Sequence, residues 1–369
     1  MVAHRLDGGD DAQTMDVDER LRQVARVAGL DLSAGVEQII SYSNDAWRIG
    51  DTVLRVCWRA DRERLVREAA LLRSLPEEVP HVEVLDEGRV EDLTWMLTRR
   101  VEGHVLSEVW EDLDVATRRD AFRQLALTLE ALHSWEPPLA LARLLSARSD
   151  QWLRLDAGNG RRLYEDQVDS ILGTDVNPLP VARALVLLSA ARGMDGVDPA
   201  LVDSVGARLA ELAPFDPFSD DKDQVLVHGD AHLGNVLWRD GRLVALLDFE
   251  WVRWGPADLE LQPFCRTLEE GHPAEALPEL AASYPRLTSH PHVVERLWLY
   301  DLAAVLRHLL VWPPGDPAES PPFHPLHRLP EMVKGSEYIE GLLGATCHAR
   351  LNVTAPAMAG CLDAIGDGG

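Results

Sequence analysis

The chain has 369 residues, and 61 Asp and Glu against 36 Lys and Arg give it a formal net charge of −25 with the histidines neutral. This surplus of negative charge argues against a protein that binds the phosphate backbone of nucleic acid. Lys222 and Lys334 are the only lysines and neither follows a glycine, which excludes a Gly-Lys-Ser/Thr phosphate-binding loop. With 46% hydrophobic residues, the chain can bury the core of one large or two medium domains.

The termini and cysteines indicate where such a protein works. The first sixteen residues carry acids where a signal peptide needs an apolar stretch, and no run reaches the roughly twenty apolar residues that span a bilayer. We therefore expect no membrane partner. The four cysteines are scattered without a paired motif, which favours a reducing compartment, so we expect a cytoplasmic protein. They are Cys57, Cys265, Cys347 and Cys361.

The first hundred residues are rich in predicted strands. A helix over 17–30 comes first, and a second helix is predicted over 61–75 because its apolar residues recur at helical spacing and it stops before a proline. Turn residues separate short β-prone runs around these helices. The predicted strands are 36–42, 46–49, 52–58, 82–85 and 93–98, the last two on either side of Asp86-Glu87-Gly88.

Helical patterns dominate the remainder of the chain. The predicted helices are 116–133, 179–192, 199–212, 293–311 and 331–343, with a Pro-rich loop over 312–330. Strands followed by helices predict an α+β fold in two lobes. We expect an N-terminal extension and helix over 1–34, a strand-rich N-lobe over 35–100 and a helical C-lobe over 101–369.

The most informative segment is 224–262. An apolar run there ends in His228-Gly229-Asp230, Asn235 follows, and Asp240-Gly241 is a strong hairpin turn. A simple hairpin places Asn235 opposite Leu246 and one diagonal step, roughly 7 Å, from Asp248. Carboxylate and amide oxygens at that separation suit Mg²⁺, whose remaining ligands are substrate phosphates and waters.

The neighbouring residues complete a set for phosphoryl transfer. Asp230, at the loop mouth, can accept the proton of an attacking hydroxyl. Arg55 on an apolar strand, held by Glu68 on the next helix, can neutralise phosphate charge. His228 and His232 are four residues apart, but intervening glycines break any helix that would present both to zinc, so we expect His228 to form hydrogen bonds within the loop.

The run His228 to Asn235, followed by Asp248-Phe249-Glu250, resembles the aminoglycoside phosphotransferase and choline kinase superfamily, which shares the protein-kinase fold. The resemblance covers about residues 35 to 262. It implies a bilobal kinase fold and an ATP- or GTP-dependent kinase in which Asp230 is the catalytic aspartate and Asn235 and Asp248 bind Mg²⁺. In this sequence Arg55 stands where many members carry lysine.

The resemblance also implies roles for residues that the spacing alone does not identify. Ser43 and Asn44 resemble the family's turn that covers the phosphates. Thr98 to Gly103 resembles the family's linker between the lobes, which implies that Thr98 and Arg100 contact the nucleotide. Asp258 resembles a buried structural acid. From its position, Asp258 could be a helix N-cap or a partner of the catalytic loop.

These observations predict a phosphotransferase with an alcohol acceptor, with ATP or GTP and Mg²⁺ as cofactors. The acceptor is a small metabolite or antibiotic, and the net charge favours a cationic one bound by helices of the C-lobe. Two alternatives stay open. Related kinases phosphorylate Ser or Thr of a biosynthetic precursor peptide, of the lanthipeptide or thioamitide type, for a partner lyase, and a catalytically idle kinase-like binding protein is the other.

Overall fold

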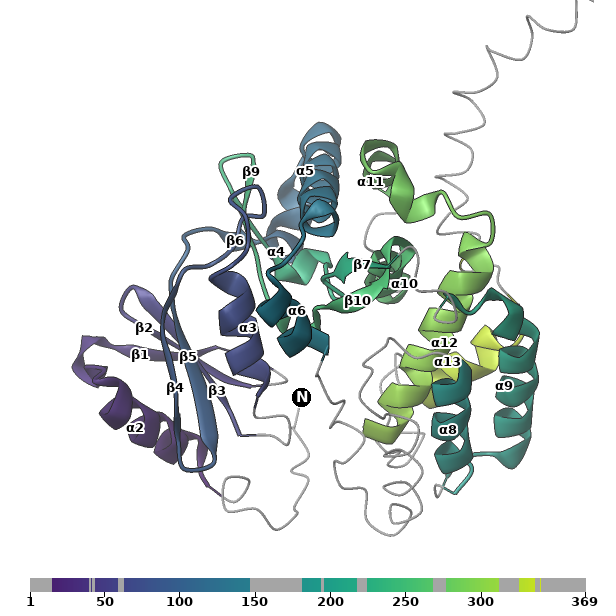
Figure 1. Ribbon diagram of the computed structural model, residues 1–369, viewed down its shortest axis with the longest axis horizontal. Coiled ribbons are helices and arrows are strands. Elements are labelled where there is room, and N and C mark those ends of the chain that lie inside the picture. Colours follow the sequence, from purple (N-terminus) through teal and green to yellow (C-terminus); the bar gives the residue numbers. More distant parts are fainter. Residues whose placement is uncertain are drawn as a thin grey trace, which may run out of the picture.

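The computed structural model describes residues 15–39, 41, 44–58, 63–146, 181–193, 196–217, 224–267, 277–311, 325–335 and 339. Figure 1 shows two regions side by side, one built on a β-sheet and one built mostly of helices. The α+β fold predicted from the sequence is confirmed. Within the described residues, no helix is long and apolar enough to cross a membrane.

The sheet region contains one five-stranded antiparallel sheet in the order β1-β2-β3-β5-β4. Short turns join β2 to β3, as the sequence predicted for 45–58, and β4 to β5, whereas a helix lies between β3 and β4. The strands are β1 (Val36–Ile39), β2 (Asp45–Ile49), β3 (Thr52–Cys57), β4 (Val84–Val90) and β5 (Leu93–Arg99).

Helices cover both faces of this sheet, because its strands alternate between two sets of buried side chains. Leu54 and Trp95 lie on the outer face and pack in one cluster with α2 (Val17–Ala28). Met96 lies on the inner face, in the larger cluster that includes α3 (Arg64–Leu72). Figure 1 shows α2 on the far side of the sheet from the helical region and α3 on the near side.

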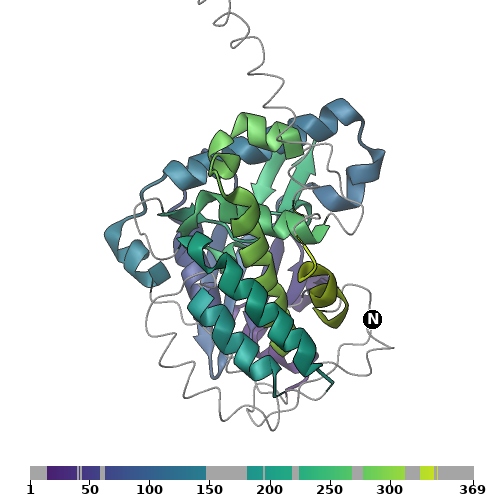
Figure 2. The same ribbon diagram turned by 90° about the vertical axis from the view of Figure 1, so that its right-hand side faces the viewer.

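The helical region surrounds two small sheets, β10-β7 and β6-β8-β9. Figure 2 shows α8, α9 and α12 packed as neighbouring helices. The strands are β6 (His104–Val105), β7 (Gln224–Val227), β8 (Val236–Arg239), β9 (Arg242–Leu246) and β10 (Arg253–Pro256). The helices are α4 (Leu106–Val109), α5 (Val115–Ser134), α6 (Leu139–Ser146), α8 (Val181–Ala191), α9 (Pro199–Leu212), α10 (Gln262–Thr267), α11 (Leu277–Ser283), α12 (Val293–Val311) and α13 (Pro325–Met332).

The predicted break at Asp86-Glu87-Gly88 is wrong, because β4 runs through it. The turn between β4 and β5 lies at Glu91-Asp92, where Glu91 has φ 50°. A Cβ on Gly88 would lie 2.8 Å from the indole ring of Trp95. Packing against Trp95 across the strand pair therefore requires a glycine here. In the sequence, the same glycine after two acids is typical of a turn.

The predicted boundaries near the end of the chain are also wrong. Helix α13 begins at Pro325, inside the predicted loop, and ends at Met332, where a helix was predicted to be starting. A proline at the first helical position lacks only an N–H that would have no partner within the helix. The carbonyl of Met332 accepts a hydrogen bond from Nε1 of Trp298, at 2.9 Å, which ties α13 to α12.

Candidate active site

The β8–β9 hairpin positions Asn235 and Asp248. Its turn is at Asp240-Gly241, as predicted, with φ 50° and 76°. A register shift between Leu237 and Trp238 changes the pairing beyond it, so Val236, and not Asn235, faces Leu246. The predicted register is therefore wrong by one residue, because a bulge cannot be read from the turn.

The shifted register places Asn235 beside Leu247, the residue that precedes Asp248. The N–H of Leu247 donates to the carbonyl of Asn235 at 2.8 Å, and Asp248 is the next residue. Asp248 has φ 63° and ψ 56°, a left-handed conformation that side chains other than glycine seldom adopt. Backbone strain of this kind concentrates at functional sites.

Arg55 connects the sheet to this hairpin. Its Nη1 lies 2.6 Å from Oε1 of Glu68, so the structure brings together the strand cation and the helix acid chosen from the sequence. Its Nη2 lies 2.7 Å from Oδ1 of Asp248 and 3.2 Å from Oε2 of Glu250. Burial alone would lower the pKa of Arg55, but the three carboxylates raise it, so the guanidinium stays charged.

Glu250 is the centre of these contacts, and no role for it was predicted from the sequence. Its side chain is 1% exposed. It accepts a hydrogen bond of 2.9 Å from Nδ2 of Asn44 and lies 3.4 Å from Nη1 of Arg64. The charged network, as we call this group, comprises Asn44, Arg55, Arg64, Glu68, Asp248 and Glu250.

The charged network carries more negative than positive charge, with three carboxylates and two guanidinium groups. Burial and the charge of Glu250 raise the pKa of Asp248, although Arg55 acts in the opposite direction. Carboxylate oxygens of Glu68, Asp248 and Glu250 lie within 4.8 Å of one another. A divalent cation at Asp248 would relieve this excess of negative charge.

Asp230 and Asn235 are joined directly. Nδ2 of Asn235 donates to the carbonyl oxygen of Asp230 at 2.8 Å and to its Oδ2 at 3.1 Å. These bonds use the amide hydrogens, so Oδ1 is the atom that Asn235 can offer to a cation. Oxygen donors from an amide and a carboxylate fit Mg²⁺. The side chain of Asp230 is 18% exposed, so its carboxylate is open to solvent at this edge.

His232 also lies at this site, although from the sequence it was considered only as a zinc ligand. The N–H of Gly234 donates to its Nδ1 at 3.0 Å, which makes Nδ1 an acceptor. Its Nε2 lies 3.6 Å from Oδ2 of Asp230. The ring is thus held against the carboxylate of Asp230 by the backbone of its own loop.

A second buried group supports the loop that carries Asp230. Glu260 is fully buried and accepts hydrogen bonds from the backbone N–H groups of His228 and Gly229, the latter at 3.1 Å. Its Oε1 lies 3.1 Å from Nε2 of His133, and Nδ1 of His133 is 3.0 Å from the hydroxyl of Tyr284. We call His133, His228, Glu260 and Tyr284 the loop-support network.

The loop-support network satisfies the buried carboxylate of Glu260 with hydrogen bonds. Burial alone would raise the pKa of Glu260, but the hydrogen bonds and the nearby imidazoles outweigh it and lower that pKa. Burial lowers the pKa of His228, which is therefore neutral. Its Nε2 bonds the carbonyl of Leu247 at 2.9 Å, and the N–H of Asp230 donates to its Nδ1 at 3.2 Å. His228 thus links the loop of Asp230 to the residue before Asp248.

Asp258 lies close in sequence to Glu260 but contacts different residues. Its carboxylate pairs with Arg296 of α12 at 2.8 Å and accepts a hydrogen bond from the hydroxyl of Tyr300 at 3.0 Å. Burial raises its pKa to about 6 despite Arg296. Of the two acids, only Glu260 contacts the loop backbone among the bonds of the described residues. The sequence pattern does not distinguish the two acids, because their partners are set by the three-dimensional path of the chain.

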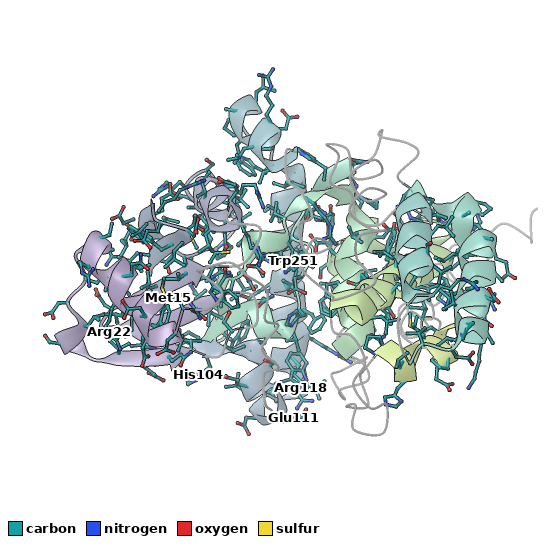
Figure 3. The ribbon with its side chains drawn as sticks, turned by 90° about the horizontal axis from the view of Figure 1, so that it is seen from below. Met15, Arg22, His104, Glu111, Arg118 and Trp251 are labelled. Atoms are coloured by element: carbon teal, nitrogen blue, oxygen red, sulfur yellow. The ribbon has the colours of Figure 1, made fainter. Side chains whose placement is uncertain are left out.

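The structure locates the other residues chosen from the sequence as follows. Ser43 is outside the described residues. Thr98 is buried on β5, with Oγ1 3.4 Å from the carbonyl of Val53. Arg100 follows β5 and is exposed, and its N–H donates to the carbonyl of Asp51. In Figure 3, Trp251 lies near the centre of the molecule, and its carbonyl would be 2.9 Å from a Cβ on Gly229.

Comparison with known proteins identifies the family of the chain. A model of the phosphotransferase enzyme family matches residues 35–297. The chain belongs to this family. No curated protein gives a significant match.

Solved structures with the same fold are distant in sequence. The GDP complex of aminoglycoside 2′-phosphotransferase-IIIa is 18% identical, with 86% of this chain and 97% of that chain covered, at a TM-score of 0.57. The streptomycin and ATP complex of APH(2″)-IIa is 14% identical, covering 88% and 98%, at 0.54. The apo form of a thermostable APH(4)-Ia mutant is 18% identical, covering 92% and 99%, at 0.51.

At these identities the structures establish the fold, and the family match establishes the class of enzyme. The protein is a phosphotransferase of the kinase type that acts on a hydroxyl group. The family, the protein-kinase-like fold and the enzyme class expected from the sequence are confirmed. Among the solved structures with this fold, some hold GDP or ATP.

Proposed function

We propose that this phosphotransferase moves the γ-phosphoryl group of ATP or GTP, with Mg²⁺, to a hydroxyl of a small cationic metabolite or antibiotic. The observation that carries the proposal is the pair of bonds from the Asn235 amide nitrogen to Asp230, which leaves Oδ1 of Asn235 available to a cation beside the partly exposed Asp230 carboxylate. The left-handed turn at Asp248 adds the second oxygen ligand.

In this mechanism Asp230 is the catalytic residue. Its carboxylate accepts the proton of the acceptor hydroxyl as the oxygen attacks the γ-phosphorus, the bond from the γ-phosphorus to the β,γ-bridging oxygen breaks, and ADP or GDP leaves. The short loop from Asp230 to Asn235 keeps the carboxylate next to the metal ligand without requiring it to bind the metal. His228 and Glu260 hold the loop backbone, so the carboxylate is positioned before the nucleotide arrives.

Asn235 and Asp248 are the residues that would hold Mg²⁺. When bound, the ion would neutralise charge on the phosphate oxygens. Arg55 supplies a second positive charge, and its planar guanidinium reaches Glu68 and the Asp248 side at the same time, which a lysine ammonium cannot do in the same geometry. We place Ser43, Asn44, Thr98 and Arg100 around the nucleotide, with residues 35–100 as the nucleotide-binding lobe and 101–369 as the lobe that binds the acceptor.

The cationic acceptor is supported by charge and by analogy. The chain has a formal charge of −25, and the charged network itself has an excess carboxylate. Solved structures of the same fold include a GDP and kanamycin complex, 18% identical over 88% of this chain, at a TM-score of 0.54. The residues 147–180 and 218–223, within the segment expected to hold the acceptor, are outside the described residues.

The direct test is transfer of ³²P from labelled ATP and GTP to a panel of aminoglycosides, choline-like amines, hydroxyamino acids and Ser/Thr-containing peptides. We expect Mg²⁺-dependent labelling of a cationic small molecule, and we expect Asp230→Ala to remove transfer while nucleotide binding stays close to wild type. Unchanged turnover in Asp230→Ala would contradict the assignment of the base. Labelling of peptides alone would replace the small-molecule acceptor with a precursor peptide, and no labelling with no nucleotide-dependent thermal shift would indicate an idle binding protein.

A further inference from the structure

Helix α2 lies outside the residues 35–297 that the family model matches, yet it carries a buried arginine. The side chain of Arg20 is 7% exposed. Its Nε lies 2.5 Å from Oδ2 of Asp45, its Nη1 donates to the carbonyl of Met15, and its guanidinium carbon lies 4.7 Å from the ring centroid of Trp58. Buried arginines are rare without such partners. Arg20 therefore fastens α2 to the start of β2 and to the residue after β3.

The partner of Arg20 is next to a residue of the charged network. Successive side chains of a strand point to opposite faces of the sheet. Asp45, at the start of β2, turns to the outer face with Trp47, where α2 packs. Asn44 comes immediately before it and donates from Nδ2 to Oε2 of Glu250 at 2.9 Å. A contact on the outer face thus fixes the backbone that carries a contact on the inner face.

The contacts continue to the proposed metal ligand. Oε2 of Glu250 lies 3.2 Å from Nη2 of Arg55, and the same Nη2 lies 2.7 Å from Oδ1 of Asp248. The described contacts therefore form an unbroken series from the outer helix α2 to Asp248. From the outer helix inward, the contacts join Arg20, Asp45 with its neighbour Asn44, Glu250, Arg55 and Asp248.

We infer that Arg20 is a positioning residue of the nucleotide site, which acts through Asp45 and Asn44 on Glu250 and Arg55. The inference rests on the proposed function where it concerns nucleotide affinity. It makes α2 a functional part of the nucleotide-binding lobe and not only a cover for the outer face of the sheet. Loss of the Arg20 contact frees the start of β2, and Asn44 then holds Glu250 less well.

The experiment compares Arg20→Met and Arg20→Lys with Arg22→Met in the full-length protein. Arg22 lies on the same helix, is 56% exposed and pairs with Glu19, so it is the matched control; it is labelled in Figure 3. Hydrogen exchange is measured over 44–49 and 248–251, and affinity for ATP is measured by calorimetry with and without Mg²⁺. The cycle of Arg20→Met, Asn44→Ala and the double variant is measured in parallel.

We expect Arg20→Met to lose exchange protection in both segments and to weaken ATP binding by roughly three- to tenfold. Arg20→Lys should show a smaller loss and Arg22→Met none. The double variant should bind ATP no more weakly than the weaker single variant. Lost protection around α2 alone, with 248–251 and ATP affinity unchanged, or additive effects in the cycle, would overturn the inference.

The two readouts separate this inference from the proposed function. If the wild-type protein binds no nucleotide, the proposed function fails, and exchange at 248–251 still decides whether Arg20 acts on the Asp248 side. If the wild type binds ATP and Arg20→Met binds it equally well, the inference fails while the proposed function stands. Should Arg20→Met not fold, the comparison of Arg20→Lys with Arg22→Met gives the same decision.

Discussion

Two buried glutamates ten residues apart hold the site in different ways. Glu250, in the charged network, is surrounded by Arg55, Arg64 and two further carboxylates. Glu260, in the loop-support network, receives hydrogen bonds from two backbone N–H groups and His133. The first group has one more carboxylate than guanidinium groups, an excess that a cation can balance, whereas in the second group hydrogen bonds satisfy a single carboxylate.

In the proposed mechanism, this difference separates the groups whose partners change during the reaction from the groups whose partners stay the same. A nucleotide and a metal bring charge, so the groups that meet them need carboxylates whose partners can be exchanged. The loop that presents Asp230 needs one backbone conformation, and a buried acceptor of several hydrogen bonds provides it because losing any of them is costly. The predictions below disturb each side in turn.

The largest effect is expected on the loop side, from Glu260→Ala. This change leaves two backbone N–H groups and His133 without their acceptor in a fully buried place. Each unsatisfied buried donor costs about 1–3 kcal/mol, so we expect the free energy of unfolding to fall by several kcal/mol. Urea unfolding monitored by tryptophan fluorescence measures it.

Glu260→Gln is the companion variant, because it keeps one acceptor oxygen and should lose less stability than Glu260→Ala. Glu211→Ala serves as a control, since Glu211 is 63% exposed and lies on α9. Equal stability of Glu260→Ala and wild type would show that the loop backbone does not depend on this carboxylate.

In the charged network, we expect Arg55→Lys to change stability less than Glu260→Ala does and to change ligand binding more. The lysine keeps the charge, but its three N–H groups share one nitrogen, so it cannot reach Glu68 and Asp248 from two separate nitrogen positions as the guanidinium does. We expect affinity for ATP to change by about tenfold while the melting temperature falls by only a few degrees. Calorimetry and thermal denaturation of the same sample report both values, and a large fall in melting temperature without any change in affinity would reverse the assignment of the two sides.

The smallest effect concerns Asp258, which belongs to neither network. Its pKa is raised to about 6 in the folded protein from an ordinary value of 3.8, so between those values the folded state binds more protons than the unfolded state. Stability contributed by this group therefore rises as pH falls through 6 and is lost as pH rises through it. We expect the wild type to gain about 1 kcal/mol relative to Asp258→Asn between pH 7 and pH 5.

Urea unfolding of both proteins at the two pH values checks this sign. The wild type should gain relative to the amide variant on acidification, because the amide does not titrate. A difference between the two proteins that stays constant, or grows in the opposite direction, would mean that the carboxylate is not held at the raised pKa.

Local patterns were sufficient to predict most strands of the sheet region and the segment in which the candidate site lies. Alternation and turn residues predicted the hairpin from 45 to 58, and the Asp240-Gly241 signal predicted the turn that joins β8 to β9. The spacing of Asp230, Asn235 and Asp248 drew attention to a segment that the structure folds into one place. These features depend on residues that are close in sequence.

The errors have physical causes that a local pattern does not contain. The bulge near Leu237 shifts the register by one residue, and the turn signal carries no information about it. Gly88 lies within a strand because Trp95 packs over it from the neighbouring strand. Glu250 and Glu260 obtain their partners from α3, α5 and the sheet, at sequence separations that periodicity does not report.

The most direct measurement is the binding of Mn²⁺ with ATP, followed by electron paramagnetic resonance, in the wild type and in Asp248→Ala, Asn235→Ala and Asp230→Asn. If one amide and one carboxylate oxygen hold the ion, the first two variants lose the metal-dependent part of ATP binding, whereas Asp230→Asn keeps it and loses only transfer. Metal and ATP bound by Asp248→Ala as tightly as by the wild type would contradict the account.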